Sequence, residues 1–438
     1  MRRGLLAILA ALAVGSVAAC EEELPTSLDG AGLPIDIRTF EIELPWSEFG
    51  ETIESFGGFG RVGDIAGSVV AHQLGGLVEA RALVSFPIFP PQLTVLDSTG
   101  TAVIDPDIRA TSATLIAFLD TARIDSLSTA EFSLGALEQR WVQSSATWEA
   151  AVDSLGGMKL WDEPGAGPVR PVSQTTYSFA ETADSVLLEF DSLTLALWDS
   201  TLVERSLRID LLTPGQRMRF TRFRMRIEFA SAINPDTVLT ADISPFRESF
   251  VYSPIPDPPP EGRVRVGGAP AYRTVLRMTV PRILNGPPEL CDIVGCPFTL
   301  TPNNVNRASL VLQSRPTEPS AYQPVDSVFL DARPVLAPEI LPKSPLGSSF
   351  VGGISFAPSN FVEPGGAVLD IPITLFLQNL LFESLMDDQG EPDVRADIAL
   401  LTLVEPFDIA FVEFDGAASP DPPRLRFLVT VSDSLRFR

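Results

Sequence analysis

Short segments in which apolar and charged residues alternate dominate the sequence. At residues 223–229, Phe, Met, Ile and Phe alternate with Arg and Glu, and the same period of two recurs at residues 40–44, 263–266 and 424–427. Successive side chains of a β-strand point to opposite faces, so this pattern indicates strands with one buried face. The 39 prolines and 31 glycines divide these runs into short pieces. The sequence therefore favours antiparallel sheets joined by turns over strands that alternate with helices.

Helix signals are few, and one proline cluster divides the chain. Apolar residues recur at helical spacing at residues 147–155 and 374–386. The sequence PIPDPPP at residues 254–260 favours extended chain and cannot enter a central strand. We predict an all-β protein with two antiparallel β-sandwich domains in tandem and few short helices. The predicted boundaries are residues 36–252 for the first sandwich, 253–261 for the proline-rich linker and 262–438 for the second sandwich.

Four short blocks of the first half recur in the same order in the second half. The pairs are residues 81–86 with 273–278, 113–116 with 308–311, 186–195 with 368–375, and 223–229 with 425–431. A diverged duplication explains this order, and chance similarity among β-strands is the alternative.

The first twenty residues have the order of an export signal. Two arginines precede an unbroken apolar run at residues 5–14, which is too short to span a bilayer comfortably, and VAAC follows at residues 17–20. This order resembles the lipobox signal peptide of bacterial lipoproteins. The resemblance implies a signal peptide at residues 1–19, cleavage before Cys20 and attachment of lipid to its sulfur. A plain secretory signal followed by an unrelated cysteine is the alternative.

The acidic cluster at residues 21–23 directly follows the predicted lipid site. It resembles the surface-export signal of some Bacteroidota lipoproteins; a solvated acidic tether over residues 20–35 is the alternative. Either interpretation implies an extracytoplasmic protein anchored to a membrane through its N-terminal lipid. We expect the outer membrane or the cell surface rather than the inner membrane.

Charge and residue counts exclude several classes of function. The net charge of −24 argues against nucleic-acid binding, which needs a dense basic surface. One histidine, His72, and three cysteines cannot build a His-rich metal site or a zinc finger. No phosphate-binding or dinucleotide fingerprint is present, so no cofactor is expected. The acidic loops at residues 105–107 and 415–421 leave a structural calcium ion as an alternative.

Cys291 and Cys296 enclose four residues. Outside the cytoplasm, this spacing predicts a disulfide that closes a small loop.

The segment WVQSSATW at residues 141–148 places Thr before the second tryptophan, and Trp161 follows. Here the chain resembles a DNRLRE-type domain, whose strand pattern is also matched upstream at residues 81–115 and downstream at residues 188–198. The resemblance covers about residues 60–235. It implies a jelly-roll-like β-sandwich in a secreted, often surface-attached setting, without defined catalytic residues. Gln143 stands near the position of an acid often found in that family, and the second half lacks the tryptophan pair.

Trp141, Trp148 and Trp161 have two interpretations. Exposed indoles stack on sugar rings, whereas large buried ones plug the end of a sandwich, and we favour the second because a tryptophan buries so much area. We expect a non-enzymatic envelope lipoprotein that acts as a binding or structural module for envelope or extracellular polymers, such as a glycan, or for partner proteins. The alternative is a glycan-processing enzyme, with two close carboxyls across a cleft, or an accessory carbohydrate-binding subunit.

Overall fold

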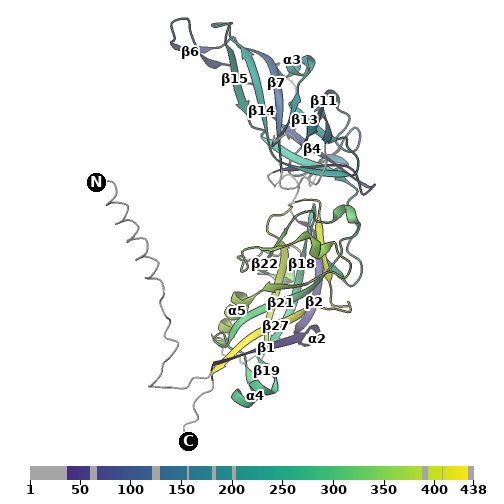
Figure 1. Ribbon diagram of the computed structural model, residues 1–438, viewed down its shortest axis with the longest axis vertical. Helices are drawn as coiled ribbons and strands as arrows, with labels where there is room; N and C mark the ends of the chain where they lie inside the picture. Colours follow the sequence, from purple (N-terminus) through teal and green to yellow (C-terminus); the bar gives the residue numbers. More distant parts are fainter. Residues whose placement is uncertain are drawn as a thin grey trace, which may run out of the picture.

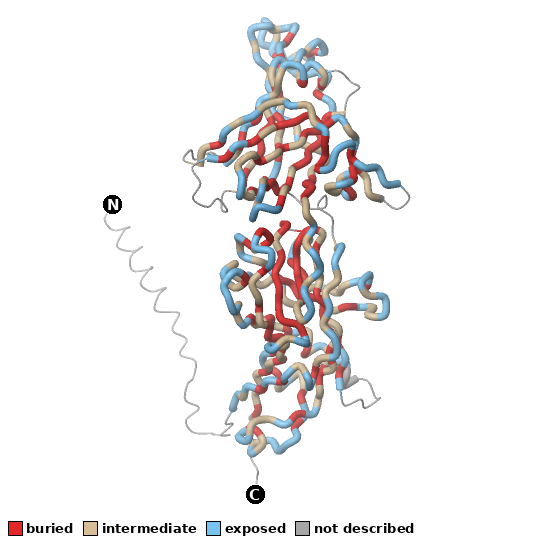
Figure 2. Tube along the Cα trace, turned by 90° about the vertical axis from the view of Figure 1, so that its right-hand side faces the viewer, coloured by how far each residue is buried: buried red, intermediate tan, exposed pale blue. Residues whose placement is uncertain are grey.

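The computed structural model describes residues 37–59, 67–120, 129–154, 157–179, 184–199, 204–386, 393–406 and 408–432. Strands dominate these residues, and all the paired strands of both large sheets are antiparallel. They form two domains stacked along the long axis of the molecule (Figure 1). Buried residues run through the middle of each domain (Figure 2). The prediction of an all-β protein built from sandwiches is confirmed.

Domain 1, residues 68–253, is a sheet of ten described strands folded into a sandwich, in the order β11-β8-β13-β4-β3-β14-β7-β12, with β15 beside β14 and β16 beside β4. The strands are β3 (Ser68–Leu74), β4 (Val78–Ser85), β7 (Arg109–Leu119), β8 (Thr129–Leu137), β11 (Arg170–Ser178), β12 (Ser185–Glu189), β13 (Ser206–Leu211), β14 (Gln216–Ala230), β15 (Val238–Ile243) and β16 (Arg247–Ser253). Helix α3 (Ser192–Asp199) and two ribbons, β5 (Leu93–Leu96) with β6 (Ala102–Asp105) and β9 (Ala150–Ser154) with β10 (Gly157–Leu160), flank this sheet.

Domain 2 is a sheet of eleven described strands, in the order β1-β27-β21-β26-β17-β18-β25-β22-β23, with β2 beside β18 and β24 beside β21. The strands are β1 (Ile37–Pro45), β2 (Gly50–Phe59), β17 (Arg263–Gly267), β18 (Ala271–Pro281), β21 (Val305–Arg315), β22 (Val328–Pro334), β23 (Ile354–Phe356), β24 (Val368–Pro372), β25 (Asp393–Thr402), β26 (Phe411–Asp415) and β27 (Arg424–Ser432). The other elements are β19 (Ile283–Leu284), β20 (Phe298–Thr299), helices α2 (Trp46–Phe49), α4 (Pro288–Val294) and α5 (Thr374–Met386), and the 3-10 turns η3 (Ser320–Tyr322), η4 (Pro338–Ile340) and η5 (Pro358–Phe361).

The predicted start of the first sandwich, at residue 36, is wrong. β1 pairs with β27 from Ile37↔Ser432 to Pro45↔Arg424, and β2 pairs with β18, so residues 37–59 complete domain 2. The reason is burial: Ile42 and Leu44 pack into the core of domain 2. Domain 1 is thus inserted into domain 2. The proline-rich linker does lie between the domains, as predicted, joining β16 to β17.

One of the two predicted helices exists. Residues 374–386 form α5, but residues 147–149 form a bend and residues 150–154 form the strand β9 instead. Ala150 and Ala151 are buried, and β9 pairs with β10. Tertiary packing therefore overrides the helical spacing of this segment.

A buried ion pair joins two strands of domain 2. Arg265 of β17 and Glu413 of β26 are 2% and 0% exposed, with Nη2 2.8 Å from Oε1. The guanidinium also lies 3.8 Å from the centre of the Phe411 ring and donates to the carbonyl of Asp257 in the proline-rich linker. Arg265 therefore links the linker, the sheet and an aromatic ring at one point.

We predict that Arg265→Ala lowers the free energy of unfolding by about 3 kcal/mol. The substitution removes the nearest ion-pair partner of the buried Glu413 carboxylate. Arg424→Ala is the matched control, since the pair that Arg424 forms with Glu43 is 39% and 32% exposed. This control should cost at most about 1 kcal/mol. Urea denaturation measures both, and equal losses would contradict the prediction.

Candidate site at the domain junction

Trp141 and Trp161 are core residues. Their exposed fractions are 0% and 4%, and they pack with Leu83, Leu137 and Val251 on one face of the domain 1 sheet. Trp141 Nε1 donates to Ser206 Oγ at 3.1 Å, and Trp161 Nε1 donates to the Thr147 carbonyl at 2.8 Å. Buried indoles with paired nitrogens offer no face to a sugar, so the ligand-stacking alternative is wrong for these two.

Trp148 is half-buried, and its ring is covered. The Arg81 guanidinium lies 4.7 Å from the ring centre, and Arg81 Nη1 also donates to the Gly165 carbonyl at 2.7 Å. Gly165 has a φ of 80°, and a Cβ there would lie 2.8 Å from the indole. Only glycine therefore allows this close approach. Contacts with Arg81 and Gly165 therefore occupy part of the indole that the ligand-stacking alternative would leave open.

The other predicted residues are distributed as follows. Cys291, within helix α4, and Cys296, just after that helix, form the predicted disulfide. Cys20 and the predicted signal and tether lie outside the described residues. Within the described ranges, no three His, Cys, Asp or Glu side chains gather closely enough to hold a metal ion. No helix in this part of the chain has the length and apolar character needed to cross a membrane.

The acidic loops proposed as calcium ligands meet protein donors. The Asp105 carboxylate accepts bonds from Ser231 Oγ at 2.6 Å and from the backbone N–H of Ala232 at 2.9 Å. Asp415 and Asp421 both pair with Arg315. These hydrogen bonds and ion pairs occupy carboxylate oxygens that a calcium ion would need as ligands.

The two domains meet through an apolar contact. Phe250 and Tyr252 of β16, with side chains of β3 and β4, pack against Tyr322 and Phe411 of domain 2. Tyr322 stacks on Phe411 with ring centres 5.5 Å apart, and its hydroxyl donates to the Pro254 carbonyl. This contact fixes the position of one domain on the other, and two pockets open beside it.

The larger pocket has a volume of 470 Å³ and is lined by both domains. From β14, Arg217 Nη1 lies 3.8 Å from Asp408 Oδ1 of domain 2, and both side chains are at least nine-tenths buried. Arg217 Nη2 also donates to the Gln323 carbonyl at 3.3 Å. On the same strand, Arg219 Nη1 lies 3.6 Å from Asp120 Oδ2. The pocket thus has two arginine–aspartate pairs in its walls, and the charges of those pairs cancel.

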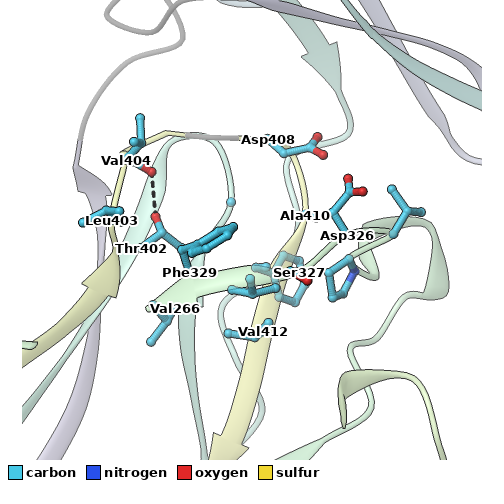
Figure 3. A pocket seen from close by; sticks show the side chains of 15 residues that line it. Val266, Asp326, Ser327, Phe329, Thr402, Leu403, Val404, Asp408, Ala410 and Val412 are labelled. Carbon is cyan, nitrogen blue, oxygen red and sulfur yellow. Dashed lines mark hydrogen bonds between the residues drawn. The ribbon is translucent and has the colours of Figure 1, made fainter. Parts of the chain in front are cut away.

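The smaller pocket has a volume of 90 Å³ and lies within domain 2. Val266 and Val412 lie at one end, and Asp326 and Asp408 lie at the opposite end (Figure 3). The Thr402 hydroxyl donates to the Val404 carbonyl at 2.9 Å. Asp408 and Val325 line both pockets, so the two form neighbouring compartments of one candidate binding site.

Sequence reasoning missed this site because its residues come from distant segments. Arg217 was assigned to no motif, and its partner Asp408 is 191 residues away in the chain. The signal present in the sequence is an arginine on a strand, and many strands of this chain share that signal. No spacing pattern distinguishes an arginine that faces the other domain from one that faces water.

Comparisons with known proteins add little to this geometry. No family model matches the sequence, and no characterised protein is similar to it in sequence. Among solved structures, the infectious bursal disease virus Gt strain is 12% identical, with 93% of this chain and 82% of that chain covered and a TM-score of 0.11. The Macrobrachium rosenbergii nodavirus is 10% identical, with 93% and 94% covered and a TM-score of 0.11. Overlaps at this TM-score support no inference about function.

Glu248 of β16 lies beside the tryptophan cluster and makes domain 1 sensitive to pH. Its backbone N–H donates to Gln143 Oε1 at 3.3 Å, and burial raises the pKa of its carboxyl to about 7 from an ordinary value of 4.5. Between these two values, the folded chain holds a proton that the unfolded chain has lost. Stability is therefore full below pH 4.5 and falls as the pH rises toward 7.

We predict that Glu248→Gln raises the free energy of unfolding at pH 8 by about 1 to 2 kcal/mol, a value reduced for partial exposure of the carboxyl. The variant should match the wild type at pH 4. Urea unfolding at both pH values measures this difference. Glu131→Gln, on an exposed position of β8, is the control and should change neither value. The assignment would be contradicted if the difference in stability between the wild type and Glu248→Gln stayed constant from pH 5 to pH 7.

Proposed function

We propose that this protein is a lipid-anchored, non-enzymatic module of the cell envelope that binds an envelope or extracellular polymer, or a partner protein, at the domain junction. The observation that carries the proposal is the position of the first and last described residues. Ile37 pairs with Ser432, and this end of β1 lies at the side of domain 2 remote from domain 1 (Figure 1). A lipid on Cys20 would therefore hold domain 2 near a membrane and direct the junction pockets and domain 1 away from it.

The chemistry of the larger pocket favours a ligand of low net charge. Its arginines are paired with aspartates, and the whole chain carries −24. A polyanion would meet repulsion without a free cluster of cations to bind it. Neutral hydroxyl and amide groups can bond to the guanidinium and carboxylate edges, while the adjoining apolar pocket accepts an aliphatic group. A neutral polysaccharide or an uncharged peptide segment meets both requirements.

The enzymatic alternative gains no support from the larger pocket. A glycosidase needs two carboxyls that face each other across the substrate. The two carboxylates that line the larger pocket, Asp120 and Asp408, each lie within 4 Å of an arginine instead. We therefore retain the binding function.

We predict that Cys20→Ala abolishes membrane attachment. The full-length wild type should incorporate labelled fatty acid and partition into the detergent phase, because several acyl chains anchor a protein stably. The variant should do neither. Cys291→Ala with Cys296→Ala is the control and should keep the label. If the Cys20 variant still partitions into detergent, the anchor proposal fails.

We also predict that Val325→Arg weakens ligand binding at least tenfold. Val325 is 53% exposed and lines both pockets, so a long cation there fills the site without disturbing a core. Val238→Arg is the matched control, since Val238 is 64% exposed on β15 in domain 1 and lines neither pocket. A glycan array and envelope pull-down with the unlipidated full chain measure both. Equal binding by the two variants would contradict a ligand-binding site at the domain junction.

A further inference from the structure

The two domains use the same set of strand pairings. In domain 1, β4 pairs with β3, β13 and β16, β8 pairs with β13 and β11, and β14 pairs with β3, β7 and β15, while β7 also pairs with β12. In domain 2, β18 has the pairings of β4, β22 has those of β8, and β21 has those of β7. Strands β26 and β27 together have the pairings of β14. Helices α3 and α5 occupy the same place, each directly before the strand that pairs with β4 or β18. This agreement supports the duplication that the sequence blocks indicate.

The correspondence extends to a pair of strands that precedes each repeat in the chain. We call β1–β2, residues 37–59, the first arm and β15–β16, residues 238–253, the second arm. β15 lies beside β14 as β1 lies beside β27, and β16 lies beside β4 as β2 lies beside β18. Chain order therefore places the first arm before the strands of domain 1 and the second arm before those of domain 2. Each arm nevertheless docks on the other repeat.

We infer that the two repeats exchange arms reciprocally, and that the edges of β27 and β18 form a binding site whose ligand is the two-stranded first arm. The second arm reaches its place through a short turn after β14. In domain 2 the first arm takes the equivalent place and covers the edges of β27 and β18.

The first arm has the features of a bound ligand. Ile42, Leu44 and Phe49 are buried in the domain 2 core, where they join the side chains of β27 and β18. Main-chain pairing runs along the whole of β1, and bonds at its exposed face add specificity: Thr39 Oγ1 lies 2.8 Å from Thr430 Oγ1, and Arg424 Nη1 donates to Glu43 Oε1 at 2.7 Å. On β2, the Ser55 hydroxyl accepts from the Arg265 backbone N–H at 2.7 Å. This is strand addition to sheet edges, with side-chain pockets that select the sequence.

None of these contacts depends on the peptide bonds that follow Phe59. An arm supplied on a separate molecule should therefore occupy the same edges, so a second copy of the arm can compete with the first. Loss of the arm would expose the edge of β27 and the apolar side chains beneath it, which is a site for association with other chains.

The test uses the full-length chain with a protease site inserted between residues 62 and 63. After cleavage in native buffer, the piece that carries residues 37–59 should co-elute with the remainder on size exclusion, and the amides of β27 should keep their protection from hydrogen exchange. A fluorescent peptide of residues 37–59, added in excess with urea below the unfolding midpoint, should then replace that piece at one peptide per chain.

Substitutions made in the peptide keep the test independent of chain folding. Ile42→Asp places a charge in the domain 2 core and should weaken incorporation at least a hundredfold. Ile37→Asp makes the same substitution at a position of the same strand that is 65% exposed, and it should change incorporation less than tenfold. Release of the arm on cleavage of the wild type, while β27 stays protected, would overturn the inference. Equal incorporation of the two variant peptides would also overturn it.

Discussion

The antiparallel ladder between β1 and β27 is the interaction on which the arrangement of this molecule depends. It places the first and last described residues side by side and completes the sheet of domain 2. Because β2 continues from β1 along β18 and then leads to β3, domain 1 becomes an insertion rather than a leading module. The first and last described strands therefore lie in one domain, and the junction pockets lie on the side of that domain that faces the other.

The tryptophans and the junction show how burial separates structural groups from candidate binding groups. The tryptophan cluster covers one face of the domain 1 sheet, with its indole nitrogens bonded to Ser206 and to the Thr147 carbonyl. The junction instead keeps charged side chains beside open volume, with Arg217 facing Asp408 across the two domains. An ion pair that lines a cavity can form hydrogen bonds to a neutral ligand, and neither charge is then left buried without a partner. A ligand-binding role is therefore better supported for the domain junction than for the tryptophan cluster.

Local patterns in the sequence predicted local features correctly. The alternation at residues 223–229 lies in β14, residues 374–386 form α5, and Cys291 joins Cys296. Failures arose where a distant partner decides the outcome. Residues 147–155 have helical spacing, but Ala151 packs in one cluster with Leu83 and Val251, and residues 150–154 form strand β9. The partner of β1 is almost four hundred residues away, and nothing in the alternation at residues 40–44 says which sheet it joins. The larger junction pocket combines residues from both domains, so it exists only once the domains have docked.

The insertion also sets an order of events during synthesis. The strands of domain 1 occupy one continuous stretch, so that domain can close as soon as residue 253 has emerged from the ribosome. The first arm is made earlier still, yet Thr39 must wait for Thr430, 391 residues later. Contacts of such separation form slowly. Until the last strand arrives, an apolar strand near the N-terminus has no partner in domain 2, and a chaperone or export factor that shields it would protect the nascent chain from aggregation.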